Sequence, residues 1–457
     1  MVRAYKKILL FFILFTATLY CDSAVLGVQG EIHSSIGIFI KDIKADTIVF
    51  QDNADRCLTP ASITKCYTAA SAMSLLPKDF QFETKVYLSG AEAGNGVWNG
   101  DIIIKASGDP TLDSEYFSKN ATFLSELVNT IIKNNITKLN GDIVLLRVNE
   151  QHQYEEGPID TWNINDIGWA YGCGIFDFNW CDNIFGLYPA TGKTTFDIPG
   201  LKYKVWDSPW NDGLTIIRGV YSDSLIISGK KYVTDRKARI NTTMPYPFAV
   251  FRATLINKLN DAGIDITFKK NNFITKKLIL NHTSPRIDEI LKSLMLRSDN
   301  MYAEGVLRVL GEKYGDRESS LKAEKALWRA RGLEPQYNRI LDGSGLSRAN
   351  AISPRFLAGV LEYMAKSPMQ QRFTSLFPVS GVSGTLKSFM ADTPMKGRLA
   401  MKTGSVNAVQ TYAGYLLDNN GQPTHVIVFM ANNFFCTRTQ LRDALSKFLL
   451  NKLNLYL

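Results

Sequence analysis

The sequence lacks the residue patterns on which several large classes of hydrolase depend. Only four histidines occur among 457 residues, and none forms an H-E-x-x-H pair, which excludes the common type of zinc peptidase. A G-x-S-x-G motif is also missing, which disfavours a histidine-assisted serine hydrolase. Gly192-Lys193-Thr194 resembles the end of a phosphate loop, but five residues instead of four separate it from Gly186, and we interpret it as a turn.

Long apolar runs, internal repeats and low-complexity linkers are scarce as well. After the first 25 residues no stretch of 18 apolar positions occurs, so we expect no transmembrane helix in the mature chain. The formal charge of +9 is spread along the chain instead of being gathered in basic blocks. This distribution suits a loose association with an anionic envelope, and it gives no reason to expect a nucleic-acid partner.

Residues 1–24 have the pattern of a signal peptide. Basic residues precede the apolar run Ile8 to Leu19, and small residues follow it. Tyr20 is bulky where a lipid-anchored start at Cys21 would favour a small residue. The sequence therefore predicts export without a lipid anchor.

Cysteine is sparse beyond this segment and shows no C-x-x-C spacing. The remaining five cysteines are an odd number, which leaves at least one thiol unpaired within the chain. A disulfide between Cys173 and Cys181 is one alternative, and free buried thiols are the interpretation that we favour. The five positions are 57, 66, 173, 181 and 436.

The two ends of the chain are predicted to supply one sheet and its helices. Alternating apolar residues predict two strands within Ser35 to Phe50. Thr59 as a cap and Pro60 at the first helical position predict a helix that runs to about Leu76. Near the other end we expect three strands and a final helix, at Leu399 to Met401, Thr411 to Leu417, His425 to Met430 and Thr437 to Leu453.

The middle of the chain has a different pattern of predicted secondary structure. Short strands predominate from a turn at Asn99-Gly100 to about Lys237, and helical spacing returns at Pro247 to Asp261 and at Ile287 to Leu310. We therefore predict an α/β sandwich domain formed from residues 25–79 and 286–457. Residues 80–285 are predicted to be a β-rich insertion of one or two extra domains.

Ser62-Ile63-Thr64-Lys65 is the first candidate for catalysis. A serine and a lysine three residues apart share one face of a helix, so that the amine can reach the hydroxyl proton. Ser62 lies in the first turn of the predicted helix, where free backbone N–H groups favour developing negative charge. The spacing alone is weak evidence, because Ser228 to Lys231 and Ser319 to Lys322 also satisfy it and are interpreted as surface pairs.

Ser298-Asp299-Asn300 is the second candidate and interrupts a helical stretch. In a loop, Ser298 could relay a proton, while Asn300 offers both a donor and an acceptor to a substrate amide. A helix cap is the simpler interpretation of this motif on its own, because all three residue types are favoured there. The same S-x-N spacing recurs at Ser118-Lys119-Asn120 and at Ser405-Val406-Asn407.

Lys402-Thr403-Gly404-Ser405 is the third candidate and is expected at the end of a strand. Gly404 would let a substrate backbone approach the strand edge closely. The K-T-G triplet occurs once in the chain. A strand that ends in a glycine turn is the alternative for this motif alone.

The order S-x-x-K, S-D-N, K-T-G is far more specific than any one of the three motifs. The combination resembles the penicillin-binding proteins and the serine β-lactamases. The long stretch between Ser62 and Ser298 is similar to that of the low-molecular-mass class C penicillin-binding proteins, the D-alanyl-D-alanine carboxypeptidase and endopeptidase family. Further stretches agree with this family, namely residues 106–112, 245–264, 298–304, 342–348 and 377–386.

The resemblance implies a nucleophilic mechanism on peptidoglycan stem peptides. Ser62 would attack the carbonyl of the penultimate D-alanine and form an acyl-enzyme, which water then hydrolyses. Lys65 would take the Ser62 proton, with its pKa lowered by burial and by the charge of Lys402. Ser298 would pass the proton to the leaving amine.

The same resemblance implies how the peptide is held. Asn300 and the strand of Lys402 would bind the peptide backbone, and Thr403 and Ser405 would meet the terminal carboxylate. Backbone N–H groups of Ser62 and Ser405 would form the oxyanion hole.

Location, inhibitors and cofactors follow from the resemblance as well. We expect an enzyme of the bacterial periplasm or cell envelope, β-lactam antibiotics as covalent inhibitors, and no metal or organic cofactor. A β-lactamase is one alternative, although no acidic residue can be assigned from the sequence as a second base. A catalytically silent envelope-binding protein of the same fold is another, although all three motifs are complete.

Overall fold

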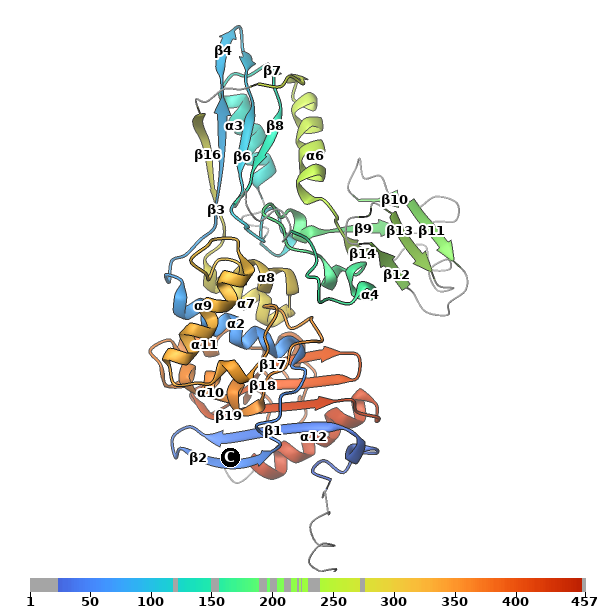
Figure 1. Cartoon of the computed structure of the whole chain (residues 1–457), viewed down its shortest axis with the longest axis vertical. Helices are drawn as coiled ribbons and strands as arrows, with labels where there is room; N and C mark the ends of the chain where they lie inside the picture. Colours follow the sequence, from blue (N-terminus) through green and yellow to red (C-terminus); the bar gives the residue numbers. More distant parts are fainter. Residues whose placement is uncertain are drawn as a thin grey trace, which may run out of the picture.

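The computed structural model describes residues 24–117, 122–148, 156–188, 195–197, 204–208, 215–219, 222, 224–228, 239–271 and 276–453. Figure 1 shows a body that contains both ends of the chain, with residues from the middle of the chain forming an upper and a lateral part. Most of the signal peptide expected at residues 1–24 lies outside the described residues. So do Ser118-Lys119-Asn120, Gly192-Lys193-Thr194 and Lys231.

The body is built on a five-stranded antiparallel sheet in the order β17-β18-β19-β1-β2. Strand β1, from the beginning of the chain, pairs along its whole length with β19, from near the end, with Ile38 opposite Phe429. The expected strands are therefore confirmed, and so is the α/β class formed from both chain ends. The strands are β1 (Ser35–Asp42), β2 (Thr47–Asp52), β17 (Leu399–Val406), β18 (Val409–Leu417) and β19 (Pro423–Asn432).

Helices cover both faces of this sheet (Figure 1). Phe39 packs in the apolar cluster shared with α2 and α10, whereas Ile38 and Ile40 pack in the cluster shared with α12 on the opposite face. This alternation is what a strand buried on both sides requires. The helices of the body are α2 (Thr64–Leu75), α7 (Ile287–Arg297), α8 (Asn300–Leu307), α9 (Arg317–Ala330), α10 (Pro354–Lys366), α11 (Gln370–Thr374) and α12 (Arg438–Leu453).

The upper part of the molecule contains two four-stranded sheets, with the orders β16-β3-β6-β8 and β15-β7-β5-β4. Two helices, α3 (Phe123–Lys133) and α6 (Pro247–Asp261), pack against them around one apolar cluster. The strands are β3 (Glu83–Ser89), β4 (Ala91–Gly94), β5 (Val97–Asn99), β6 (Ile102–Lys105), β7 (Lys138–Asn140), β8 (Ile143–Leu146), β15 (Asp265–Thr267) and β16 (Lys276–Thr283).

The lateral part holds two three-stranded sheets, β10-β9-β14 and β11-β13-β12, and the short helix α4 (Ile164–Ile167). The middle region is thus rich in strands, as expected. Helix α3 and several parallel strand pairs in this region were not predicted. The strands are β9 (Ile184–Tyr188), β10 (Thr195–Phe196), β11 (Lys204–Ser208), β12 (Thr215–Arg218), β13 (Ser224–Ser228) and β14 (Ile240–Thr243).

Two local expectations are wrong. Thr59 caps no helix, because the chain first forms a 3-10 turn and the Thr59 hydroxyl donates to the backbone oxygen of Arg348. The K-T-G motif lies inside β17, which continues to Val406, instead of at a strand end. The expected turn at Asn99-Gly100 is present as a bend at Gly100, between β5 and β6, which belong to different sheets.

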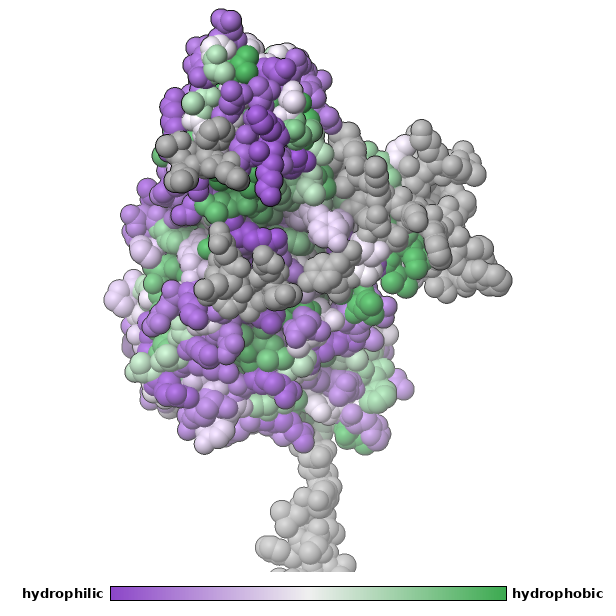
Figure 2. Space-filling model, turned by 45° about the horizontal axis from the view of Figure 1, so that its top comes forward, coloured by the Kyte–Doolittle hydropathy of each residue, from purple (hydrophilic) through white to green (hydrophobic). Residues whose placement is uncertain are grey.

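Cysteines 57, 66, 173, 181 and 436 are free thiols in the described part of the chain. The alternative of a Cys173–Cys181 disulfide is therefore wrong, and the favoured interpretation holds, except that Cys57 is exposed and Cys181 is half-buried. None of the helices in the described ranges is long and apolar enough to cross a membrane. Figure 2 shows a mainly hydrophilic surface on the face that it presents, with apolar residues in small separate patches.

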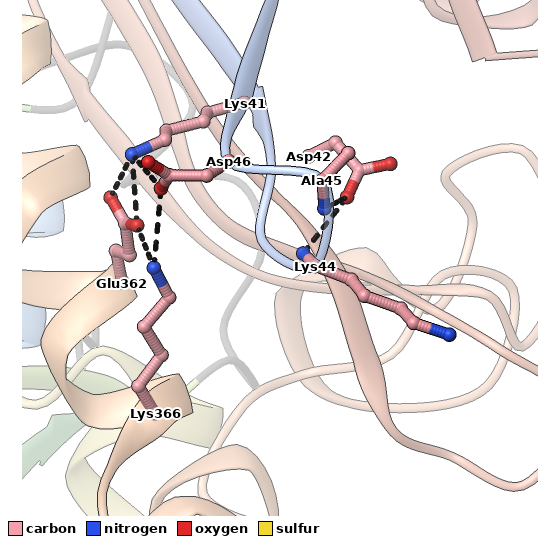
Figure 3. Close-up of polar contacts among 7 residues, drawn as sticks. All are labelled: Lys41, Asp42, Lys44, Ala45, Asp46, Glu362 and Lys366. Atoms are coloured by element: carbon pink, nitrogen blue, oxygen red, sulfur yellow. Dashed lines mark hydrogen bonds and ion pairs between the residues drawn. The ribbon is translucent and has the colours of Figure 1, made fainter.

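An ionic network ties the turn between β1 and β2 to α10 (Figure 3). The Lys41 ammonium lies 2.7 Å from Asp46 and 2.9 Å from Glu362, and Lys366 also contacts both carboxylates. Both carboxylates thus bridge the same two lysines. Nearby, the Asp42 carboxylate accepts the backbone N–H groups of residues 44 and 45 and shapes the turn.

Candidate active site

Ser62 lies in the 3-10 turn Ala61–Ile63, which leads directly into α2. Two glycines leave the space that this turn occupies. A Cβ atom on Gly404 would lie 2.8 Å from the Pro60 oxygen and 2.9 Å from the Ser62 nitrogen, and one on Gly345 would overlap the Ala61 oxygen. The glycine of K-T-G is therefore required by the backbone of the serine turn itself, a reason that the sequence did not reveal.

Lys65 is fully buried and its amine has three hydrogen-bond partners. Nζ lies 2.9 Å from Ser62 Oγ, 2.6 Å from Asn300 Oδ1 and 2.7 Å from the Ser344 carbonyl oxygen. The last two groups can only accept hydrogen bonds. A neutral amine has two N–H donors for them and a lone pair left for the serine O–H. The geometry thus suits a neutral Lys65 that receives the Ser62 proton.

Burial lowers the pKa of Lys65 to about 8, although the carboxylates of Asp342, Glu304 and Asp299 act in the opposite direction. Burial also lowers the pKa of Lys402, followed by repulsion from the Lys65 charge. The lowering of the Lys65 pKa through burial agrees with expectation. The expected effect of the Lys402 charge on Lys65 is not found; the repulsion between the two lysines lowers the pKa of Lys402 instead.

The S-D-N motif forms the junction between α7 and α8. Ser298 has a left-handed backbone with φ of 62°, and the Asp299 carboxylate caps α8 by accepting the Tyr302 N–H. Capping therefore belongs to the middle residue, which leaves the outer two for the site. Asn300 accepts from Lys65 with Oδ1 and donates through Nδ2 to the Tyr171 carbonyl oxygen at 2.7 Å, so its amide orientation is fixed at both ends.

The K-T-G motif reaches the other two motifs from β17. Lys402 Nζ lies 2.8 Å from Ser298 Oγ and 2.6 Å from the Thr403 carbonyl oxygen. Thr403 contacts the Thr385 hydroxyl, and Ser405 accepts a hydrogen bond from Arg438. All eight residues expected in the site are therefore brought to one region, linked through two buried lysines.

The outer edge of β17 is only partly paired. Met401 N–H donates to the Pro378 oxygen and Ser380 N–H donates to the Leu399 oxygen, so alternate residues of β17 face this edge. By the same alternation the N–H groups of Thr403 and Ser405 face it too. The hydroxyl-bearing residues Ser62, Ser298, Thr403 and Ser405 are partly or fully exposed, whereas both lysines are buried.

Several residues of the site were not identified from the sequence as functional. Glu304 is buried on α8 and accepts the N–H groups of Gly343 and Ser344 at 3.1 and 2.8 Å. The Asp342 carboxylate accepts from Gly345 N, Ser347 N, Asn350 Nδ2 and Trp162 Nε1 and holds the loop that carries Ser344. The stretches 303–304 and 342–348 agree with the resembled family, and this agreement was the available signal.

The fold of this chain is similar to that of solved structures. A structure of penicillin binding protein 4 (dacB) from Haemophilus influenzae superposes with a TM-score of 0.76 at 24% identity, covering 93% of this chain and 96% of that one. A second structure of that protein, complexed with a β-lactam, gives a TM-score of 0.72 at 23% identity, with coverage of 94% and 96%. The architecture is that of a penicillin-binding protein.

The particular family follows from the sequence. A sequence model of the D-Ala-D-Ala carboxypeptidase 3 (S13) family matches residues 23–178 and 214–451, so the chain belongs to this family of serine-type carboxypeptidases. The D-alanyl-D-alanine carboxypeptidase DacB of Haemophilus influenzae is 27% identical over 427 residues, which cover 87% of this chain and 85% of that protein. The resemblance identified from the three motifs is therefore confirmed.

Proposed function

We propose that this chain is an exported enzyme that cleaves D-alanyl-D-alanine linkages in peptidoglycan stem peptides through an acyl-enzyme on Ser62. Contact of the buried Lys65 amine with Ser62 Oγ at 2.9 Å carries the proposal. The other two hydrogen bonds of Lys65 go to groups that can only accept. When two fixed acceptors take the two N–H groups of a neutral amine, its lone pair points at the nucleophile.

The proposed acylation step begins with Ser62. Its Oγ–H proton moves to the neutral Lys65 amine while Oγ attacks the carbonyl carbon of the penultimate D-alanine. The tetrahedral intermediate then collapses with cleavage of the C–N bond. The leaving amine takes the proton that Lys65 received, relayed by the Ser298 hydroxyl, which contacts Lys402, and Lys65 is neutral again. Water hydrolyses the ester and restores the Ser62 hydroxyl.

Substrate binding is proposed at the outer edge of β17. Its pairing with Pro378–Ser380 ends before Lys402, so an extended peptide can add alongside Thr403 and Ser405. Thr403 and Ser405 would bind the terminal carboxylate, with Arg438 behind the Ser405 hydroxyl. The N–H of Ser405 faces the same edge, which supports its role with the Ser62 N–H in stabilising the oxyanion.

A role as a β-lactamase finds less support. Rapid deacylation needs a base for the attacking water. The candidates are the three carboxylates that act electrostatically on Lys65, those of Asp342, Glu304 and Asp299. Each one already accepts hydrogen bonds from protein groups, Asp299 from Tyr302 N–H and from Arg297. A slow release of the penicilloyl group is therefore expected, so that a β-lactam inhibits the enzyme.

Covalent labelling tests the nucleophile. Incubation with labelled penicillin, digestion and peptide mapping should place the label on Ser62. Ser319 is the matched control, because it also precedes a lysine by three residues but lies at the start of α9. Label on Ser319, or label that survives Ser62→Ala, would refute the assignment.

Digestion of purified peptidoglycan tests the substrate. Mass analysis that finds free D-alanine from pentapeptides would indicate carboxypeptidase activity, and monomers from crosslinked dimers would indicate endopeptidase activity. Penicillin should block both products. Neither product from an enzyme that penicillin labels would refute the proposed substrate. Export itself is tested by fractionating cells that express the full chain.

A further inference from the structure

Glu304 is a buried carboxyl group that the proposed mechanism does not yet use. It is 1% exposed and lies one helical turn after Asn300 on α8. Its oxygens accept the N–H groups of Gly343 and Ser344. The Ser344 carbonyl oxygen in turn accepts from Lys65 Nζ. Two successive positions on one helix face therefore hold the lysine, Asn300 directly and Glu304 through the backbone of Ser344, whose N–H donates to Glu304 and whose carbonyl oxygen accepts from Lys65.

Within the described ranges no lysine or arginine side chain donates a hydrogen bond to Glu304, although an uncompensated buried carboxylate is costly. Burial raises the pKa of Glu304 to about 7, followed by the charge of Asp342, while the two backbone N–H groups act in the opposite direction. The charge of Glu304 raises the pKa of Lys65. Lys65 is thus the cation that can compensate it.

We propose that Glu304 is a positioning residue for acylation, which holds the backbone of Ser344 against Lys65 and stabilises, through its negative charge, the ammonium that forms when Lys65 takes the Ser62 proton. The inference rests on the proposed roles of Ser62 and Lys65. A carboxylate lies behind the catalytic base here as in a Ser-His-Asp triad, but the backbone of Ser344 stands between the two groups in place of direct contact. No proton reaches Glu304 in this step.

A carboxylate in this place has two effects with opposite consequences. It makes Lys65 a stronger base, which speeds proton transfer once the amine is neutral. It also raises the pH at which the amine becomes neutral. A residue that only supported the fold would change the rate by the same factor at every pH, so the pH profile separates the two roles.

Other charged and titratable groups face Lys65 and Glu304 from the surrounding elements, and the test must leave them in place. Asp342 and Asp299 raise the pKa of Lys65, as does Cys66. The charge of Glu304 raises the pKa of Glu324 on α9, and Lys402 is coupled to Lys65 from β17. The groups retained in a substitution of Glu304 are Lys65, Cys66, Asp299, Glu324, Asp342 and Lys402.

The experiment measures acylation of the full chain by a chromogenic β-lactam in stopped flow between pH 5.5 and 9.5. Glu304→Gln keeps the shape and removes the charge. The midpoint of the rise in rate with pH should move down by about one unit. The plateau should fall by up to about tenfold, because one pKa unit of basicity corresponds to tenfold in proton affinity.

Two further variants complete the test. Glu304→Asp keeps the charge but shortens the arm, so the plateau should fall with little movement of the midpoint. Glu324→Gln is the matched control, since Glu324 is also fully buried, and burial raises its pKa to about 8, which leaves it uncharged at neutral pH. Below pH 8, where Glu324 is mainly uncharged, its profile should equal that of the wild type.

The outcomes separate this inference from the proposed function. A wild-type chain that is not acylated at Ser62 would overturn both. A wild-type chain that is acylated, with a Glu304→Gln midpoint unchanged, would overturn only the role of Glu304. A midpoint shift of the same size in Glu324→Gln would also overturn the role of Glu304. If Glu304→Gln does not fold, Glu304→Asp provides the test, and a shift of its midpoint by a full pH unit would overturn the role of Glu304.

Discussion

Replacing Lys65 with arginine separates a base from a mere positive charge. Arginine keeps the charge and roughly the reach, but its guanidinium stays protonated at any accessible pH. A neutral Lys65 can use its lone pair for the Ser62 proton while it donates to Asn300 and Ser344. An arginine has no such lone pair, so Lys65→Arg should leave the penicillin site formed and unreactive.

The structure sets the size of the effect. A pKa of about 8, against 10.5 for an ordinary lysine, makes about one amine in ten neutral at pH 7. The neutral fraction is then about 300-fold larger than for an exposed lysine. Loss of a general base typically costs about 100- to 10,000-fold. Acylation should therefore fall at least 100-fold, and the wild-type rate should rise about fivefold between pH 7 and 8.

Stopped-flow acylation at several pH values measures both effects, with Lys402→Arg as the comparison. Lys402 is equally buried and is assigned an electrostatic role beside Ser298, so its replacement by a permanent cation should be milder. A reversed order, with the larger loss at Lys402, would refute the reasoning and assign the base to Lys402 acting through Ser298. Circular dichroism and thermal unfolding check that both variants fold.

Three further predictions use other contacts. Gly404→Ala should slow acylation by about 100-fold, because its Cβ would lie 2.8 and 2.9 Å from backbone atoms of the serine turn. A misplacement of a catalytic group by about 1 Å can lower the rate by that factor. Gly421→Asn is the control and should leave the acylation rate unchanged, because Gly421 lies in an open turn. Trp162→Phe should lower the free energy of unfolding by about 1–3 kcal/mol in a urea titration, because Asp342 loses a buried donor. A chain in which a short linker replaces residues 80–285 should unfold cooperatively and still react with penicillin, but more slowly, because it loses the contacts of Tyr171 with Asn300 and of Trp162 with Asp342; loss of that cooperativity would make the insertion part of one core.

The sequence predicted the parts of the fold that depend on local pattern. The alternation of β1 and the helical spacing around the S-D-N motif were both visible, and the three motifs were found in the correct order. The start of α2 was predicted incorrectly. There, Thr59 and Pro60 satisfy the local rule for a capped helix, but packing against β17 and the Gly345 loop imposes a 3-10 turn instead.

The missed part of the site depends on distant contacts. Glu304 and Asp342 touch the loop of Ser344, and no local pattern shows that this loop packs against Lys65. Tyr171 contributes only its backbone oxygen, so its residue type carries no signal for that contact. Burial, which lowers the pKa of Lys65, is likewise a property of the assembled fold.

The pairing of β1 with β19 has a consequence for the biosynthesis of the protein. The pairing of β1 on both sides, with β2 and with β19, cannot be completed until β19 has been made. Such distant pairings are slow to form, because the ends of a long loop must first meet. Ser62 follows β1 closely in the sequence, whereas Lys402 is made only shortly before β19. A chain that has not yet reached β19 thus carries Ser62 without its full set of partners, and the proposed nucleophile becomes competent only after β19 has been made.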